Sequence, residues 1–320
     1  MPTRPVKHAV VTGCNRGLGL AVAKRLAQEG FRIAAVCRRP EDAQKTVAVL
    51  GRLHIPVQLD FAAGDAAVRS AAAEISTWLG SSKLLILVNN SGNSYGSWDE
   101  AAWHESRAVN YKGAICLTEE LLPNLATGAS VTMVGSGLGD LQWLSPKFQR
   151  LLAKARCVAD LDRLAHRSID SLDTNHSWVG PYGFSKALLH RATEIFAADH
   201  RFESKSILVK AVCPGWVSTD MGGAQAPISV EEGAEHILTA ALSSDATEKN
   251  GSFRCYCYKN WDEQHTRAWE EKHGKACDYE ESTDKGCCHA KDVRKSSLTR
   301  QEDRMSSTRT KKKRRSESHF

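Results

Sequence analysis

The 320-residue chain has no long apolar run. Stretches such as residues 84–88 are far too short to cross the hydrocarbon core of a bilayer, about 30 Å thick. The first eight residues also lack the apolar core of a secretory signal. We therefore expect a cytoplasmic protein without a membrane span. Its ten cysteines should then be reduced thiols rather than a disulfide framework.

Positive and negative residues nearly balance over most of the chain. The formal net charge is +6, but residues 306–320 hold six Lys/Arg and one acid, Glu317. The other 305 residues are thus close to neutral, which argues against a nucleic-acid-binding body. Hydrophobic residues make up 42% and charged residues 25%, as in ordinary soluble globular proteins.

Apolar residues become scarce toward the C-terminus. Residues 263–320 cannot bury enough apolar surface to offset chain entropy, so we expect a low-complexity, disordered basic tail. The run from Lys311 to Arg315 suits a nuclear localisation signal, a patch for nucleic acid or anionic lipid, or a solvated charge run. Cys277, Cys287, Cys288 and His289 lack a C-x-x-C pair, so no metal is expected.

Residues 1–262 show strands alternating with helices. Short apolar runs predict strands at residues 8–12, 31–37, 56–59, 84–88, 130–134, 206–212 and 252–258. Helical spacing predicts helices between most of them, including residues 66–79, 100–122, 182–201 and 230–242. This pattern indicates a single α/β domain with a doubly wound, Rossmann-type parallel sheet of about seven strands, covered by helices on both faces. Two further apolar faces predict a helical insertion at about residues 140–178.

Glycines follow the first predicted strand, in Thr12-Gly13-Cys14-Asn15-Arg16-Gly17-Leu18-Gly19. They permit a tight turn and let backbone N–H groups approach a pyrophosphate at a helix N-terminus. The second strand ends in Arg38-Arg39, with no acid for a ribose 2′-hydroxyl. Arginine there suits a 2′-phosphate, with Arg16 as a second cation, which favours NADPH over NADH. The alternative is a pair of solvated surface arginines.

Tyr182 and Lys186 lie four residues apart in a helix expected to begin at Pro181. A neighbouring ammonium favours phenolate, so the pair is a candidate proton donor tuned toward neutral pH. A solvated pair on a helix face is the alternative. The glycine loop and the other unusual clusters follow strand ends, where ligands of parallel sheets bind.

The ordered motifs resemble the short-chain dehydrogenase/reductase superfamily over about residues 7–260. They are Thr12-Gly13-x-x-x-Gly17-x-Gly19, Asn89-Asn90-Ser91-Gly92, Asn110, Ser136, Tyr182-x-x-x-Lys186 and Pro214-Gly215. Residues 121–123, 213–221 and 231–235, and the wide separation of Ser136 from Tyr182, are more narrowly similar to the monomeric NADPH-dependent carbonyl reductases. Ser91 and Gly135 depart from the usual alanine and serine, and neither change argues for an inactive enzyme.

The resemblance implies a reaction and its residues. Tyr182 would give a proton to a carbonyl oxygen as hydride arrives from NADPH, Ser136 would hold that oxygen, and Asn110 would position a water that relays protons to Lys186. Lys186 would also lower the pKa of the tyrosine and bind the nicotinamide ribose. The cofactor-binding set would be Gly13, Asn15, Arg16, Gly17, Leu18, Gly19, Arg38, Asp60, Asn90, Gly92, Tyr182, Lys186, Pro214, Gly215, Val217 and Thr219.

The sequence says less about the residues that would contact the substrate. Ser136, Trp178, Cys213 and Trp216 are candidate pocket residues, although the tryptophans and Cys213 suit core packing about as well. Cys255 and Cys257 alternate with Phe253 and are interpreted as core. The superfamily usually dimerises through the helix before Ser136 and the Tyr182 helix. An insertion packed there would cover that surface and leave a monomer.

The substrate would be a small aldehyde, ketone or quinone. Two alternatives stay open: a dedicated steroid, pterin or prostaglandin reductase of the same family, and a non-catalytic NADPH-binding sensor or scaffold that acts through the basic tail.

Overall fold

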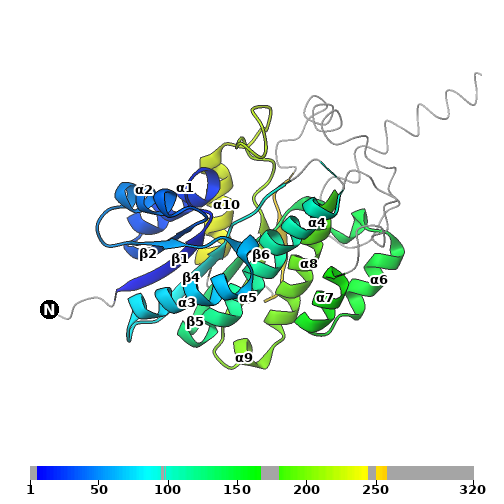
Figure 1. Cartoon of the computed structure of the whole chain (residues 1–320), viewed down its shortest axis with the longest axis horizontal. Coiled ribbons are helices and arrows are strands. Elements are labelled where there is room, and N and C mark those ends of the chain that lie inside the picture. The colour runs from blue at the N-terminus through cyan, green and yellow to red at the C-terminus, as the bar shows by residue number, and fades with distance from the viewer. Residues whose placement is uncertain (1–5, 95–96, 98, 167–179, 244–249, 258–320) are drawn as a thin grey trace, which may run out of the picture. The chain divides into compact units, whose positions relative to one another are not determined.

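The computed structural model describes residues 6–94, 97, 99–166, 180–243 and 250–257. The expected tail and Trp178 lie outside this part of the chain. The described residues contain a seven-stranded, entirely parallel sheet in the order β3-β2-β1-β4-β5-β6-β7 (Figure 1). The strands are β1 (Lys7–Thr12), β2 (Phe31–Cys37), β3 (Ile55–Gln58), β4 (Leu84–Asn89), β5 (Leu125–Val134), β6 (Leu208–Cys213) and β7 (Phe253–Cys255). The predicted doubly wound sheet is confirmed.

Helices cover both faces of the sheet because its strands are apolar on both sides. On one face pack α1 (Gly17–Gln28), α2 (Pro40–Leu50) and α10 (Val230–Leu242). On the other face pack α3 (Asp65–Leu79), α5 (Gly113–Leu121) and α8 (Gly180–Ala197). Successive residues of β1 illustrate the alternation, since Val10 faces the second group and Ala9 and Val11 the first. Because the sheet is parallel, the carboxyl ends of all its strands lie at the same edge, between the two helical layers.

Some predicted boundaries differ from the structure. The helix expected at residues 100–122 is three elements: α4 (Glu100–Arg107), a π-helical turn η2 (Ala108–Lys112) and α5. The helix expected to end near residue 201 is α8 followed by a short α9 (His200–Glu203), whose N-cap Asp199 accepts from the Arg201 N–H. β5 begins five residues earlier than predicted, and β7 is shorter. The remaining 3₁₀ turns are η1 (Phe61–Ala63), η3 (Leu122–Asn124), η4 (Gly137–Gly139) and η5 (Leu141–Trp143).

The insertion contributes two described helices, α6 (Pro146–Lys154) and α7 (Val158–Ala165). Both pack against α8. The Phe148 ring meets Phe184 edge-on at 4.8 Å between centroids, and Leu152 and Leu161 are fully buried. The predicted apolar faces of the insertion are therefore packing faces.

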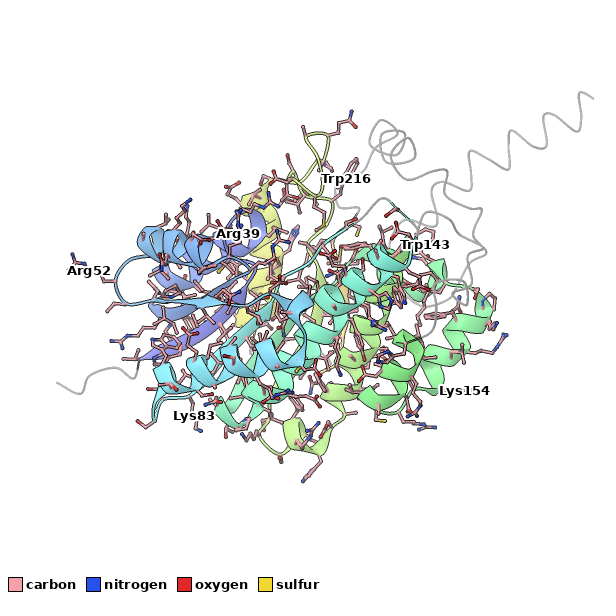
Figure 2. All side chains as sticks on the ribbon, viewed as in Figure 1. Arg39, Arg52, Lys83, Trp143, Lys154 and Trp216 are labelled. Carbon is pink, nitrogen blue, oxygen red and sulfur yellow. The ribbon has the colours of Figure 1, made fainter. Side chains whose placement is uncertain are left out.

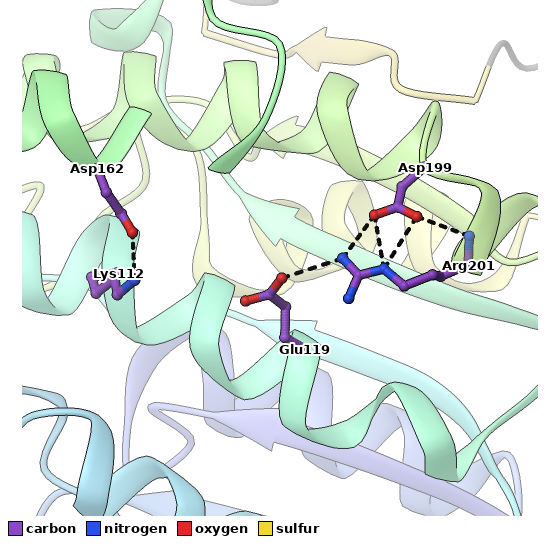
Figure 3. A network of polar contacts seen from close by, with 5 residues as sticks. All are labelled: Lys112, Glu119, Asp162, Asp199 and Arg201. Atoms are coloured by element: carbon purple, nitrogen blue, oxygen red, sulfur yellow. Dashed lines mark hydrogen bonds and ion pairs between the residues drawn. The ribbon is translucent and has the colours of Figure 1, made fainter. Parts of the chain in front are cut away.

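Polar contacts hold α7 and α9 to the rest of the domain (Figure 3). Lys112 Nζ lies 2.7 Å from the Asp162 carboxylate. The buried Tyr111 hydroxyl donates to the same side chain. Arg201 bridges Asp199 and Glu119, which ties α9 to α5. In the described part of the chain, every helix is too short or too polar to cross a membrane.

Candidate functional site

The predicted site residues surround the carboxyl ends of β1 and β4, the two strands between which the chain order reverses. Thr12 Oγ1 accepts hydrogen bonds from the backbone N–H groups of Asn90 at 3.0 Å and Ser91 at 2.9 Å. The Asn90 amide donates back to the carbonyl oxygens of Thr12 and Gly13. This reciprocal pairing fixes the two loops against each other. Such a switch point is where ligands bind in open α/β sheets.

The glycine loop adopts a backbone that only glycine accommodates well. Gly13 and Gly17 have φ values of +66° and +53°. A side chain at Gly19 would place its Cβ 2.2 Å from the Gly13 carbonyl oxygen and 2.5 Å from the Asn90 amide nitrogen. The loop leads into α1, whose N-cap residue, Arg16, makes no side-chain capping bond. The first N–H groups of α1 are thus left without a side-chain cap.

The arginines of the loop and of the end of β2 are exposed. Arg16 forms an ion pair with Asp220, which follows β6. Arg39 pairs with Asp42 at 2.8 Å, on the surface beside α2 (Figure 2). Arg38 is exposed, and its carbonyl oxygen accepts from Gln58. The sequence did not predict the Arg16–Asp220 pair, because the two residues lie 204 positions apart.

Tyr182 and Lys186 share the face of α8 that points into the site. Lys186 is 3% exposed, its Nζ donates to the Val134 carbonyl oxygen at 2.7 Å, and it lies 5.7 Å from the centre of the Tyr182 ring. Burial lowers the pKa of Lys186 from 10.5 to about 8. Burial raises the pKa of Tyr182 above its ordinary value, against a lowering by its hydrogen bond with Ser136.

The direction for Tyr182 is opposite to the one predicted from the neighbouring ammonium. The ammonium lies over the ring and bonds to Val134 rather than to the hydroxyl, so the loss of hydration dominates.

Asn110 is buried in the π-helical turn between α4 and α5. Its amide nitrogen donates to the Asn93 carbonyl oxygen at 2.9 Å and to Ser185 Oγ at 3.0 Å, while its oxygen accepts from the Asn93 N–H at 2.8 Å. A Cβ at Gly92 would meet both Asn110 Oδ1, at 3.3 Å, and Lys186 Nζ, at 3.6 Å. The structure thus brings Asn110, Gly92 and Lys186 together.

Ser136 begins the turn η4 and is positioned by a residue that the sequence analysis did not find, His190. The Ser136 N–H lies 3.3 Å from His190 Nε2, and Ser136 Oγ accepts from the Leu138 N–H. The His190 ring stacks on Phe253 at 3.9 Å. Burial, and then the Lys186 charge, lower the pKa of His190 to about 4. The ring is therefore neutral at pH 7, as an acceptor from Ser136 must be.

His190 also explains the departure at Gly135. A Cβ there would lie 2.4 Å from His190 Nε2, so the imidazole occupies the space that a serine side chain would need. His190 follows Lys186 by four residues and shares its helix face, a signal that could have been read from the sequence.

The loop after β6 folds back over the site. Gly215 has φ +95°, and a Cβ there would lie 2.3 Å from Ile228 Cδ1. Val217 is buried, and Thr219 Oγ1 accepts from the Gly222 N–H. The indole of Trp216 donates to the Gly222 carbonyl oxygen at 2.8 Å, and that of Trp143 donates to Gly137 at 2.9 Å. Both tryptophans are half-buried, Trp143 at the end of η5 and Trp216 in the loop after β6, and Figure 2 labels them.

The other predicted cofactor residues lie at the same edge. The Asp60 carboxylate caps η1 by accepting from the Ala62 N–H at 3.0 Å, while Asn15 is exposed in the glycine loop. Leu18 is half-buried on α1, and a Cβ at Gly233 of α10 would lie 2.8 Å from it, so Leu18 is in part a packing residue.

Cys213 does not stand alone. Its sulfur lies 3.0 Å from that of Cys257, and Cys255 completes a group of three thiols. Hydrogen bonds from Cys255 and then Cys257 lower the pKa of the Cys213 thiol, against burial. Cys255 and Cys257 are half-buried beside the site, so their interpretation as core residues was wrong.

Known proteins are similar to this chain in sequence and fold. A family model described as short chain dehydrogenase matches residues 7–145. Rat carbonyl reductase (NADPH) 1 is 30% identical over 273 residues, 78% of this chain and 95% of that protein. The (+)-neomenthol dehydrogenase of Arabidopsis thaliana is 28% identical over 288 residues, 77% of this chain and 95% of that protein. The structure of salutaridine reductase from Papaver somniferum superposes with a TM-score of 0.67 at 27% identity, over 77% of this chain and 99% of that one.

Gly135→Ala should destabilise the protein because its methyl group displaces the His190 ring. We expect a loss of about 1–3 kcal/mol in the free energy of unfolding, as for other overpacked sites, measured by urea denaturation. In a His190→Ala background the same change should cost at least about 1 kcal/mol less, which a double-mutant cycle detects. Equal costs in the two backgrounds would contradict the assigned contact.

Lys186 should make stability depend on pH. Between its folded pKa of about 8 and its ordinary value of 10.5, the unfolded chain binds more protons than the folded one, so stability rises with pH in this window. The free energy of unfolding of the wild type, without added nucleotide, should therefore increase from pH 8 to 10.5 relative to Lys186→Met. A difference that stays constant would show that Lys186 keeps its ordinary pKa.

Proposed function

Because this chain belongs to the short-chain dehydrogenase/reductase family, we propose that it is an NADPH-dependent reductase that converts a small aldehyde, ketone or quinone to an alcohol. The observation that carries the proposal is the placement of Tyr182 beside Ser136, whose hydroxyl acts to lower the pKa of the phenol, with the buried Lys186 ammonium 5.7 Å from the centre of the Tyr182 ring. Two hydroxyl groups, backed by a cation, converge at the ligand-binding edge of the sheet. Such an arrangement suits the stabilisation of an alkoxide that forms from a carbonyl.

The glycine loop fits a dinucleotide. Positive φ at Gly13 and Gly17 and the absence of a Cβ at Gly19 let a pyrophosphate approach the uncapped N-terminus of α1. Asn90, Gly92 and Asp60 would line the adenosine half, and Pro214, Gly215, Val217 and Thr219 the nicotinamide half. When bound, the cofactor supplies the hydride. The protein supplies orientation and protons.

Tyr182 is the proton donor in this proposal. Its raised pKa keeps the phenol protonated at neutral pH, and Ser136 shares the developing negative charge. Lys186, with a pKa of about 8, is mostly protonated at pH 7, and its ammonium lies 5.7 Å from the centre of the Tyr182 ring. Asn110, which hydrogen bonds to Asn93 and Ser185 hold in place, completes this group of polar residues beside Lys186.

The arginines favour NADPH over NADH. Arg38 and Arg39 follow β2, where the ribose 2′-position of a dinucleotide lies in this fold, and no acid takes that place. Arg39 is engaged by Asp42 and Arg16 by Asp220, so Arg38 is the arginine we assign to the 2′-phosphate. The exposed Arg16–Asp220 pair is weak enough to open for an anion.

We also propose a monomer. α6 and α7 cover α8, the helix through which members of the superfamily usually dimerise, and the Phe148–Phe184 contact and the bond from Arg191 to the Ala155 carbonyl oxygen seal that face.

Tyr182→Phe should abolish turnover and leave the cofactor bound. Loss of a general acid typically costs about 10²–10⁴-fold in rate. We would follow NADPH oxidation with a panel of quinones, aldehydes and ketones, and NADPH binding by fluorescence. Tyr256→Phe is the control, because it removes an exposed hydroxyl bonded to Arg254. Unchanged turnover in Tyr182→Phe would refute the assigned role, and tight NADPH binding without any turnover would favour a sensor.

Arg38→Ala should weaken NADPH and spare NADH. Loss of a charge-assisted hydrogen bond of about 1.5–3 kcal/mol predicts a rise of roughly 10-fold or more in the KM for NADPH, with the KM for NADH unchanged. Arg52→Ala is the matched control, an exposed arginine after α2 at the edge of the molecule (Figure 2). Equal effects on both cofactors would assign Arg38 to the surface instead.

A further inference from the structure

Three cysteines from distant parts of the chain meet at the carboxyl ends of the last two strands. Cys213 ends β6, Cys255 ends β7, and Cys257 follows two residues later. Their sulfur atoms all lie within 4.8 Å of one another, and the Cys213 and Cys257 sulfurs are 3.0 Å apart. Cys213 is buried, while Cys255 and Cys257 are half-buried.

The surroundings are built to let the sulfurs approach. A Cβ at Gly137 would lie 2.5 Å from Cys257 Sγ and 3.3 Å from Cys255 Sγ, so a side chain there would push the thiols apart. The backbones of Gly137 and Gly215 lie beside the Cys213 thiol and act to lower its pKa. Amide hydrogen bonds to sulfur are a common outer shell of thiolate–metal sites.

We propose that Cys213, Cys255 and Cys257 bind a thiophilic d¹⁰ metal ion of the Zn²⁺ type. With Zn–S bonds of about 2.3 Å in tetrahedral geometry, neighbouring sulfurs stand roughly 3.8 Å apart. In this cluster every sulfur lies within 4.8 Å of the other two, and the Cys213 and Cys257 sulfurs, 3.0 Å apart, would separate by several tenths of an ångström to receive the ion. Three protein ligands leave the fourth position to water or to a bound molecule. This site goes beyond the proposed reductase activity and does not depend on it.

The sequence led us to expect no metal, because the analysis weighed only the tail cysteines and treated Cys255 and Cys257 as core. Cys213 lies 44 residues before Cys257. Only the parallel pairing of β6 with β7, which sets Cys213 opposite Cys255, brings the three together.

The test uses the reduced, chelator-treated full-length protein and titration with Cd²⁺, read through the thiolate-to-cadmium charge-transfer band. Because the tail holds further thiols, the reference protein carries Cys277→Ser, Cys287→Ser and Cys288→Ser together. We expect it to bind one Cd²⁺ with the band intensity of three thiolates. Adding Cys255→Ser and Cys257→Ser should weaken binding more than about 100-fold, since even outer-shell changes cost about 10–100-fold. Cys157→Ser, an exposed cysteine before α7, should change nothing.

A second readout needs no change within the cluster. Bound Zn²⁺ should protect Cys213, Cys255 and Cys257 of the wild type from alkylation, mapped by mass spectrometry, and leave Cys157 reactive. Any of three results would overturn the proposal: no Cd²⁺ uptake by the reference protein, a band that survives Cys255→Ser with Cys257→Ser, or alkylation of the three cysteines that Zn²⁺ does not slow.

Discussion

The site depends on the hydrogen bonds that lock the end of β1 to the end of β4. Thr12 and Asn90 exchange donors and acceptors across the point where the chain order reverses, and the glycine loop is pressed between them. Thr12 is fully buried, so an unmade bond to its hydroxyl would leave a costly buried polar group. The position of α1, and with it the phosphate end of the site, follows from this lock.

Much of this arrangement is accessible from sequence, because it rests on local patterns. Apolar runs that end in glycine or asparagine locate the strands, and parallel strands must bring their carboxyl ends to one edge. The strand ends and the family resemblance together predict one site that holds Ser136, Tyr182 and Lys186, and the roles of these residues stay predictions. The four-residue spacing on α8 is geometry that a helix imposes.

The features that escaped prediction are set by contacts between distant residues or by hydration. His190 fills the space beside Gly135, and each looks unremarkable alone. The thiol cluster needs the pairing of β6 with β7. The pKa of Tyr182 depends on both its burial and its neighbours. The spacing of Tyr182 and Lys186 in the sequence indicates a neighbour but not the burial.

The π-helical turn at Ala108–Lys112 makes the core and the site inseparable. A π turn holds one residue more than an α-helical turn, and each residue of an α-helix advances the chain by about 100°. Removing that extra residue to restore a regular helix would rotate α5 by the same angle relative to α4. Ile115, Leu117 and Leu121, now buried, would swing away from α3 and the sheet, and Asn110 would turn from Ser185. An uninterrupted helix here could not keep both the packing of α5 and the contact of Asn110 with Ser185. The core and the site therefore both require the irregular turn.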